Sequence, residues 1–264
     1  GRLIPAPVGD LPQLASGVMD MSSGVRAEEL VGATQDTEPV DGERVVAVIG
    51  LDGDRPPVAL GTRGGVVKRW NGQSPSTKDS WSIIDLHDGD EVLFAGPATD
   101  DDRLVFVSSD ASLLTFAASA VRPQGRGSAG MAGIRLSDGS KAIAFGIIPA
   151  DRLEWRYDAN DEGLSSATGA VVLTVAGDSS ALPGTECGAA KMTPLQQYPT
   201  KGRATGGVRA QRFLVGQDRL ILAAVGPYPL HAFTDSGAPV ELPRPVMRRD
   251  ASGLELSSPI AFVV

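Results

Sequence analysis

The chain has few of the residues that enzymes usually employ. Its 264 residues include one cysteine, Cys187, and two histidines, so an internal disulfide is excluded, and neither histidine has the setting of a nucleophile–base pair. Aromatic residues make up 5%, without the clustering that stacks on single-stranded nucleic acid. A Walker-type phosphate loop is lacking, as is an apolar run long enough to span a membrane. We therefore expect no catalysis by this stretch, no membrane contact and no cofactor or metal in it.

Two further features suggest where the protein resides. A single thiol fits a reducing compartment, and the given sequence does not open with a signal peptide. The initial glycine indicates a fragment of a longer polypeptide. We expect a cytoplasmic, nucleoid-associated protein.

Glycine and proline, in contrast, are abundant, with 32 and 19 residues. This composition favours short strands and tight turns over long helices. Alternating apolar and polar residues around turn residues predict hairpins at 58–70, 104–116, 171–195 and 230–242. Links follow, then predicted third strands at 81–86, 131–136 and 208–214 and fourth strands at 91–95, 142–148 and 220–225.

The two ends of the chain fit the same pattern less completely. At the N-terminus we expect half a unit, with a second hairpin strand in 1–7, a third near Leu30 and a fourth at 45–49. Residues 259–264 are a predicted closing strand. The predicted core positions are Val58, Leu60, Ile83, Phe94, Val105, Val107, Ile143, Phe145, Ile221 and Leu222.

A repeated link is the most informative feature. The segment from Gly125 to Leu136 reappears from Gly202 to Phe213, with glycines and two arginines at one spacing. Repeated strand units of this size indicate a ring of small sheets. The sequence therefore predicts an all-β fold in which residues 1–264 form a single domain.

Charge is unevenly distributed. The net charge is −8, yet residues 121–150 hold four basic and one acidic residue, and residues 181–250 hold nine and five. Residues 1–120 hold nine basic against 19 acidic residues. Both basic blocks contain a copy of the repeated link. Recurring cations suit a ligand with recurring anions, such as the phosphate backbone of nucleic acid.

The hairpins, the segment 120–136 and the segment Lys191–Pro199 (KMTPLQQYP) together resemble the C-terminal domain of bacterial type IIA topoisomerase A subunits. The resemblance covers nearly the whole chain. It implies a β-pinwheel, a propeller-like ring of about five four-stranded blades, and a domain that binds and bends duplex DNA. The resemblance also implies two partners, which are the remainder of the A chain of the enzyme and its ATPase B chain, in an ATP-dependent parent enzyme.

Gyrase members of this family carry a box, Q-R-R-G-G-K-G, in the first blade. The nearest match here lies in a middle blade, from Gln124 to Gly130, and keeps four of seven positions. By the family's logic, a degenerate box disfavours tight wrapping. The chain then looks most like the topoisomerase IV members, which serve chromosome decatenation, with a divergent DNA gyrase member, which wraps DNA for negative supercoiling, as the alternative. A protein-binding propeller is the alternative of another class.

Arginine suits phosphate because its planar fork donates to two oxygens. Arg126 and Arg203, flanked by small residues in the links, are the preferred contacts. Arg135 and Arg212 follow strand alternation, so they are as well explained by ion pairs with acids such as Asp138. The predicted DNA-binding set is Arg122, Gln124, Arg126, Arg135, Lys191, Lys201, Arg203, Arg209 and Arg212, extended by Lys68 and Arg69. The pair Arg156-Tyr157 looks like a cleavage motif, but its acidic surroundings argue against it.

Overall fold

The computed structural model describes residues 1–10, 27–29, 44–51, 53–73, 80–158, 160–161, 164–182 and 186–264. These residues form short strands joined by turns. The strands are β1 (Arg2–Leu3), β2 (Val58–Thr62), β3 (Val66–Trp70), β4 (Trp81–Ser82), β5 (Val92–Pro97), β6 (Arg103–Ser108), β7 (Ser112–Ala117), β8 (Pro123–Gln124), β9 (Met131–Ala132), β10 (Ala142–Ile148), β11 (Ala170–Gly177), β12 (Ala189–Pro194), β13 (Val208–Arg209), β14 (Arg219–Pro227), β15 (Ala232–Phe233), β16 (Pro239–Val240), β17 (Leu254–Glu255) and β18 (Phe262–Val263). Three-residue 3-10 turns are η1 (Val8–Asp10), η3 (Ala118–Ala120), η4 (Ala150–Arg152) and η5 (Leu195–Gln197).

Neighbouring sheets exchange strands. Each unit contains a hairpin, a short link strand and a fourth strand, which is long in all units but the last. The fourth strand pairs with its own hairpin, as β5 does with β2, β10 with β6 and β14 with β11. The link strand pairs instead with the preceding hairpin: β4 with β1, β9 with β3, β13 with β7 and β17 with β12. This exchange produces five sheets in the described chain and is the β-pinwheel arrangement expected from the sequence.

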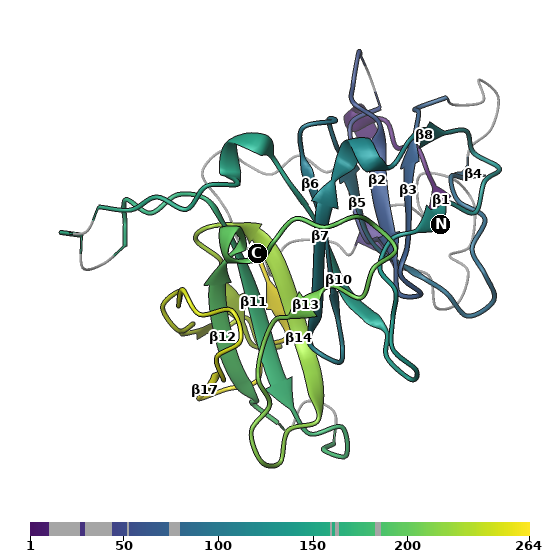
Figure 1. Cartoon of the computed structure of the whole chain (residues 1–264). Coiled ribbons are helices and arrows are strands. Elements are labelled where there is room, and N and C mark those ends of the chain that lie inside the picture. The colour runs from purple at the N-terminus through teal and green to yellow at the C-terminus, as the bar shows by residue number, and fades with distance from the viewer. Residues whose placement is uncertain are drawn as a thin grey trace.

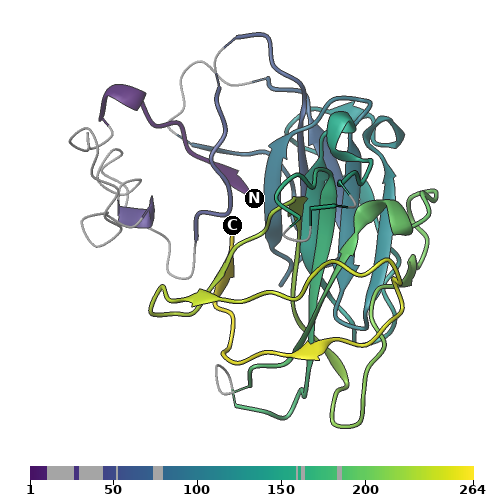
Figure 2. The same ribbon diagram turned by 90° about the vertical axis from the view of Figure 1, so that its left-hand side faces the viewer.

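The sheets lie side by side along the chain, and the C-terminal strands, in yellow, flank the sheet of β11, β12 and β14 (Figure 1, Figure 2). Strand β10 packs against both β5 and β14, the fourth strands of the adjacent sheets. The fourth strands therefore face the inside of the stack. The link strands lie at the opposite edge of each sheet, which is the outer rim.

The four predicted hairpins are all present. In the hairpin predicted at 171–195, the second strand is β12, which begins at Ala189 and pairs with β11. Tight turns permit the hairpins: Gly65, between β2 and β3, has φ +80°, a conformation that glycine adopts without steric cost. The predicted closing strand at 259–264 is present as β18, which pairs with β15.

The link strands are much shorter than expected, two residues instead of six or seven. In the second link, the amides of Gly133 and Ile134 both donate to the Gly65 carbonyl, which turns the chain away from the ladder. The fourth strand predicted at 45–49 is wrong, because these residues have no regular structure. Leu30 lies outside the described residues.

The core consists of apolar clusters between successive sheets. The expected core positions at Val58, Leu60, Ile83, Val105, Val107 and Phe145 are buried. Phe94 and Ile221 are wrong, with 39% and 40% exposure. Both lie on fourth strands, which form sheet edges, so one of their faces has less cover. Ile143 and Leu222 are half-buried.

Candidate nucleic-acid interface

The rim carries three equivalent glycine-rich links. Strand pairing aligns the three links with one another. Met131, Val208 and Leu254 are each the first residue of a two-residue link strand that pairs with the preceding hairpin. Counted back from these positions, the arginines of the three links are Arg126, Arg203 and Arg249. Each is followed four residues later by a glycine: Gly130, Gly207 and Gly253. The third copy was not predicted from the sequence, although the Arg-x-x-x-Gly spacing marks it.

Successive links are joined by one recurring backbone hydrogen bond. The backbone amide of Asp85 donates to the Ser128 carbonyl over 3.3 Å, and the backbone amide of Arg135 donates to the Thr205 carbonyl over 3.0 Å. The backbone amide of Arg212 donates to the Ala251 carbonyl over 3.1 Å. In the register above, all three bonds connect the same pair of positions. The links therefore form a continuous band along the rim instead of separate loops.

Six of the predicted contacts project from this band. The exposed cationic side chains on or beside it are those of Arg122, Arg126, Arg135, Lys201, Arg209 and Arg212, to which the third link adds Arg248. Arg135 makes no ion pair with Asp138, and neither does Arg212 with any residue in the described part of the chain. Gln124 is half-buried and accepts a hydrogen bond from Ser128, so it shapes the link internally.

Arg203 lies differently from Arg126. Its Nε donates to the Ala120 carbonyl over 3.2 Å, and its Nη1 donates to the Ala132 carbonyl over 3.1 Å. The side chain thus bridges to the preceding link. By contrast, the exposed guanidinium of Arg126 has no hydrogen-bonding or ion-pair partner within the described residues. The two arginines, equal in the sequence, are unequal as available donors.

Lys68, Arg69 and Lys191 are corrections to the predicted contact set. Their residues are 0%, 2% and 2% exposed, so none can reach a phosphate group. Arg69 donates to the carbonyls of Ala98, Ala118 and Val121 and pairs with Asp100. Both faces of β3 are covered by neighbouring sheets, and its two cations are therefore interior groups with internal partners.

Burial perturbs Lys191. Desolvation lowers the pKa of its ammonium from 10.5 to about 8, against the opposing effect of the Asp250 carboxylate. The Lys191 ammonium donates to the Arg249 carbonyl, and the charge of Arg249 acts in turn on the Tyr198 hydroxyl. Burial raises the pKa of Tyr198, so this phenol does not ionise in the folded chain near pH 9.

We expect this lysine to make stability depend on pH. Between its folded and unfolded pKa values, the unfolded chain binds more protons, so stability rises with pH. From pH 7 to pH 9, the free energy of unfolding of the wild type should rise by about 1 kcal/mol relative to Lys191→Met. Urea titrations of both proteins at each pH measure the difference. Parallel pH profiles would contradict it.

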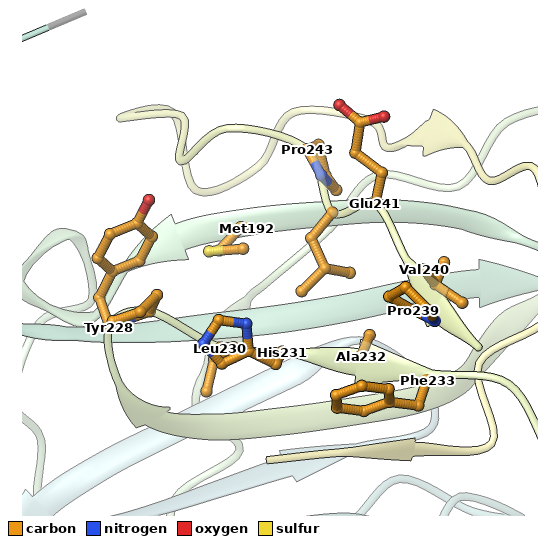
Figure 3. Close-up of a pocket in the computed structure, with 12 residues that line it drawn as sticks. Met192, Tyr228, Leu230, His231, Ala232, Phe233, Pro239, Val240, Glu241 and Pro243 are labelled. Carbon is orange, nitrogen blue, oxygen red and sulfur yellow. The ribbon is translucent and has the colours of Figure 1, made fainter. Parts of the chain in front are cut away.

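A pocket of about 270 Å³ lies at the last hairpin. It is lined by residues such as Met192, Tyr228 and Leu230 (Figure 3). The lining includes His231 and Glu241 but no lysine or arginine. Within the described residues, no three His, Cys, Asp or Glu side chains form a group that could hold a metal ion. None of the helical segments in the described ranges has the length and apolar character of a membrane span.

The chain is similar to known topoisomerase domains. The family described as "DNA gyrase C-terminal domain, beta-propeller" matches residues 102–149 and 184–225. The gyrase A protein of Haemophilus influenzae is 30% identical over 218 residues, covering 79% of this chain and 23% of that protein. The gyrase A protein of Mycobacterium tuberculosis (strain CDC 1551) is 29% identical over 189 residues, covering 69% and 19%. The chain thus spans less than a quarter of these relatives.

Solved structures share the fold. The C-terminal domain of DNA topoisomerase IV superposes with a TM-score of 0.64 at 16% identity, covering 86% of this chain and 67% of that one. The DNA gyrase A C-terminal domain gives 0.57 at 16% identity, covering 80% and 66%.

Proposed function

Because the chain belongs to the family of C-terminal domains of type IIA topoisomerase A subunits, we propose that it binds and bends duplex DNA along its rim. The observation that carries the proposal is the continuous band of three arginine-bearing links. Its cations recur at one structural position, as phosphates recur along a duplex. The described rim has no helix to enter a groove, so we infer binding without base readout.

The contact set is revised by the geometry. The leading phosphate contacts are the exposed Arg126 and the half-buried Arg249, which occupies the same link position. They are supported by the exposed side chains of Arg122, Arg135, Lys201, Arg209, Arg212 and Arg248. Arg203 ranks lower because its donors are already engaged by two carbonyls. Bending a 20–30 bp site costs on the order of 1–6 kcal/mol, which several phosphate contacts offset at low salt.

Reversing charge at the rim should weaken DNA binding without unfolding the domain. We expect Arg126→Glu and Arg249→Glu each to reduce duplex affinity on the order of tenfold at low salt, because each removes a phosphate contact and adds repulsion. The slope of log affinity against log salt should become shallower by about 1 per position. Gel shifts over a salt series with two unrelated duplexes measure both effects, and the two duplexes should lose equally.

Arg156→Glu is the matched control. Arg156 is an exposed arginine that forms an ion pair with Glu154. Both lie in the acidic loop, the segment between η4 and β11 that extends from the sheets (Figure 1). This change makes the same charge difference off the rim and should alter affinity less than twofold. Equal losses for Arg156→Glu and Arg126→Glu would mean that net charge, and not the rim, governs binding. Wild-type binding that is absent at all salt concentrations would favour the protein-binding alternative.

Within the family, we propose a role like that of the topoisomerase IV members in decatenation. The support is the degenerate segment Gln124–Gly130, which places Gly125 and Ala129 where the box has its first arginine and its lysine. A gyrase-like role is the second candidate, favoured by the sequence similarity to gyrase A proteins. Relaxing circular DNA with the domain bound and then removing protein tests the choice. Recovery of strongly supercoiled circles would indicate chiral wrapping and the gyrase-like role.

We further propose that the chain contributes no chemistry and needs no cofactor. DNA cleavage and ATP hydrolysis would then be supplied by the remainder of the A chain of the enzyme and by its ATPase B chain, in a cytoplasmic enzyme associated with the nucleoid. Tyr157 lies in the acidic loop with 52% exposure and contacts Trp155. A DNA-nicking activity abolished by Tyr157→Phe would overturn this.

A further inference from the structure

Two buried lysines occupy one position in two different sheets. Lys68 on β3 pairs across its hairpin with Leu60, and Lys191 on β12 pairs with Thr174. The first residues of the link strands, Met131 and Leu254, pair with Val67 and Ala190. Each lysine is the residue that directly follows, so the two lysines occupy equivalent positions. Neither side chain is exposed. A buried ammonium is costly to desolvate, so a repeated one calls for a repeated role.

Both ammonium groups donate to the backbone of the next link. Lys68 Nζ lies 2.9 Å from the Arg126 carbonyl and 2.8 Å from the Ser128 carbonyl. Lys191 Nζ lies 2.8 Å from the Arg249 carbonyl and 2.6 Å from Thr193 Oγ1. The acceptor shared by the two sites is the carbonyl of the arginine itself. Each lysine therefore fixes the backbone at the residue proposed to contact phosphate.

The middle sheet provides an internal comparison. There the equivalent position is Leu114, which pairs with Phe106 and cannot donate. The corresponding link is held by its own arginine, Arg203, which donates to two carbonyls of the preceding unit. In the first lysine-held link, the side chain of Arg126 is exposed and has no partner among the described residues, whereas the link without a lysine uses its arginine, Arg203, as the support.

We propose that Lys68 and Lys191 are positioning residues that hold the links of Arg126 and Arg249 in the shape required for phosphate contact. The proposal rests on the proposed DNA binding and extends it to interior residues. The lysines act through the link backbone, to which their ammonium groups donate. The rim thus has two strong anchors, one on each side of a weaker middle link.

A double-mutant cycle tests the coupling. Lys68→Met keeps an unbranched apolar side chain close in length to the lysine stem and removes the donor. We expect it to weaken duplex binding about fivefold. Combined with Arg126→Ala, it should add nearly nothing to the loss from Arg126→Ala alone, because the positioned group is gone. Combined with the distant Arg249→Ala, the two losses should multiply.

A second measurement separates this proposal from the proposed function. Without DNA, Lys68→Met should speed hydrogen exchange at amides of residues 125–130 at least tenfold and leave residues 202–207 unchanged. Faster exchange without any wild-type DNA binding would refute the DNA-binding function and leave the bracing intact. Unchanged exchange, or losses that multiply in the Lys68→Met/Arg126→Ala pair, would overturn the proposal. If Lys68→Met does not fold, the cycle of Lys191→Met with Arg249→Ala decides it.

Discussion

Arg69→Met should lower the free energy of unfolding by about 3 kcal/mol, the largest stability loss that we expect from a polar substitution in this chain. Arg69 is 2% exposed and donates to three carbonyls, of Ala98, Ala118 and Val121, at 3.0, 3.1 and 3.2 Å. All three residues are buried. Each carbonyl left without a donor costs roughly 1–3 kcal/mol, partly offset because the guanidinium no longer has to be desolvated. Urea unfolding measures the loss.

Two control substitutions separate the carbonyl bonds from the ion pair. Asp100, the carboxylate partner of Arg69, has a side chain that is 72% exposed, so Asp100→Asn should cost less than about 1 kcal/mol. Arg63→Met removes a half-exposed arginine from the same hairpin together with its pair to Glu91, and should cost equally little. If Asp100→Asn destabilised the protein as much as Arg69→Met, the exposed ion pair would be the main contribution.

Gly207→Ala should lower the free energy of unfolding by about 3 kcal/mol and separate β13 from its partner strand β7. Gly207 precedes β13 and has φ +72°, a left-handed conformation that costs other residues roughly 1–2 kcal/mol. An added Cβ would also overlap the carbonyl of Leu113, with the Leu113 carbonyl carbon 2.6 Å away. Because these are backbone atoms of β7, relief requires β13 to move away from its partner strand.

Gly202→Ala is the matched control for this substitution. Gly202 begins the same link, and nothing lies within 4 Å of a Cβ placed there. Its substitution should be neutral within about 0.5 kcal/mol. Thermal unfolding of both variants, with hydrogen exchange at β7, tests the difference. Equal stability of the two variants would show that the β13–β7 pairing tolerates displacement.

The repeating order of hairpins and fourth strands was predictable because it depends on local patterns. Alternation around Gly65 and around residues 109–111 specifies hairpins without knowledge of the rest of the chain. The short link strands were not predictable in length, since their ends are set by contacts to a neighbouring unit, such as the bonds of Gly133 and Ile134 to Gly65. Pairing with the preceding hairpin is likewise a tertiary choice.

The candidate interface was predictable in part. Glycine-flanked arginines marked two links, and the Arg-x-x-x-Gly spacing alone also marks the third at Arg249. The failures at Lys68, Arg69 and Lys191 share one cause. Polar residues on a strand usually indicate a solvent-facing side, but β3 and β12 are buried on both faces. Consecutive cations such as Lys68 and Arg69 then point to opposite faces and are both internal.

The exchange of link strands also constrains how such a chain can gain or lose units. A hairpin, its link and its fourth strand are contiguous in sequence, yet their strands are divided between two sheets. Removing residues 58–102 as one block would remove β4, the partner of β1, and also β3, the partner of β9. Strand β9 would then lie next to β1. The shortened chain would keep its connectivity, but β9 would meet Arg2 and Leu3 in place of Val66 and Val67. Duplication or loss of a unit therefore always creates a new junction whose compatibility depends on two-residue strands.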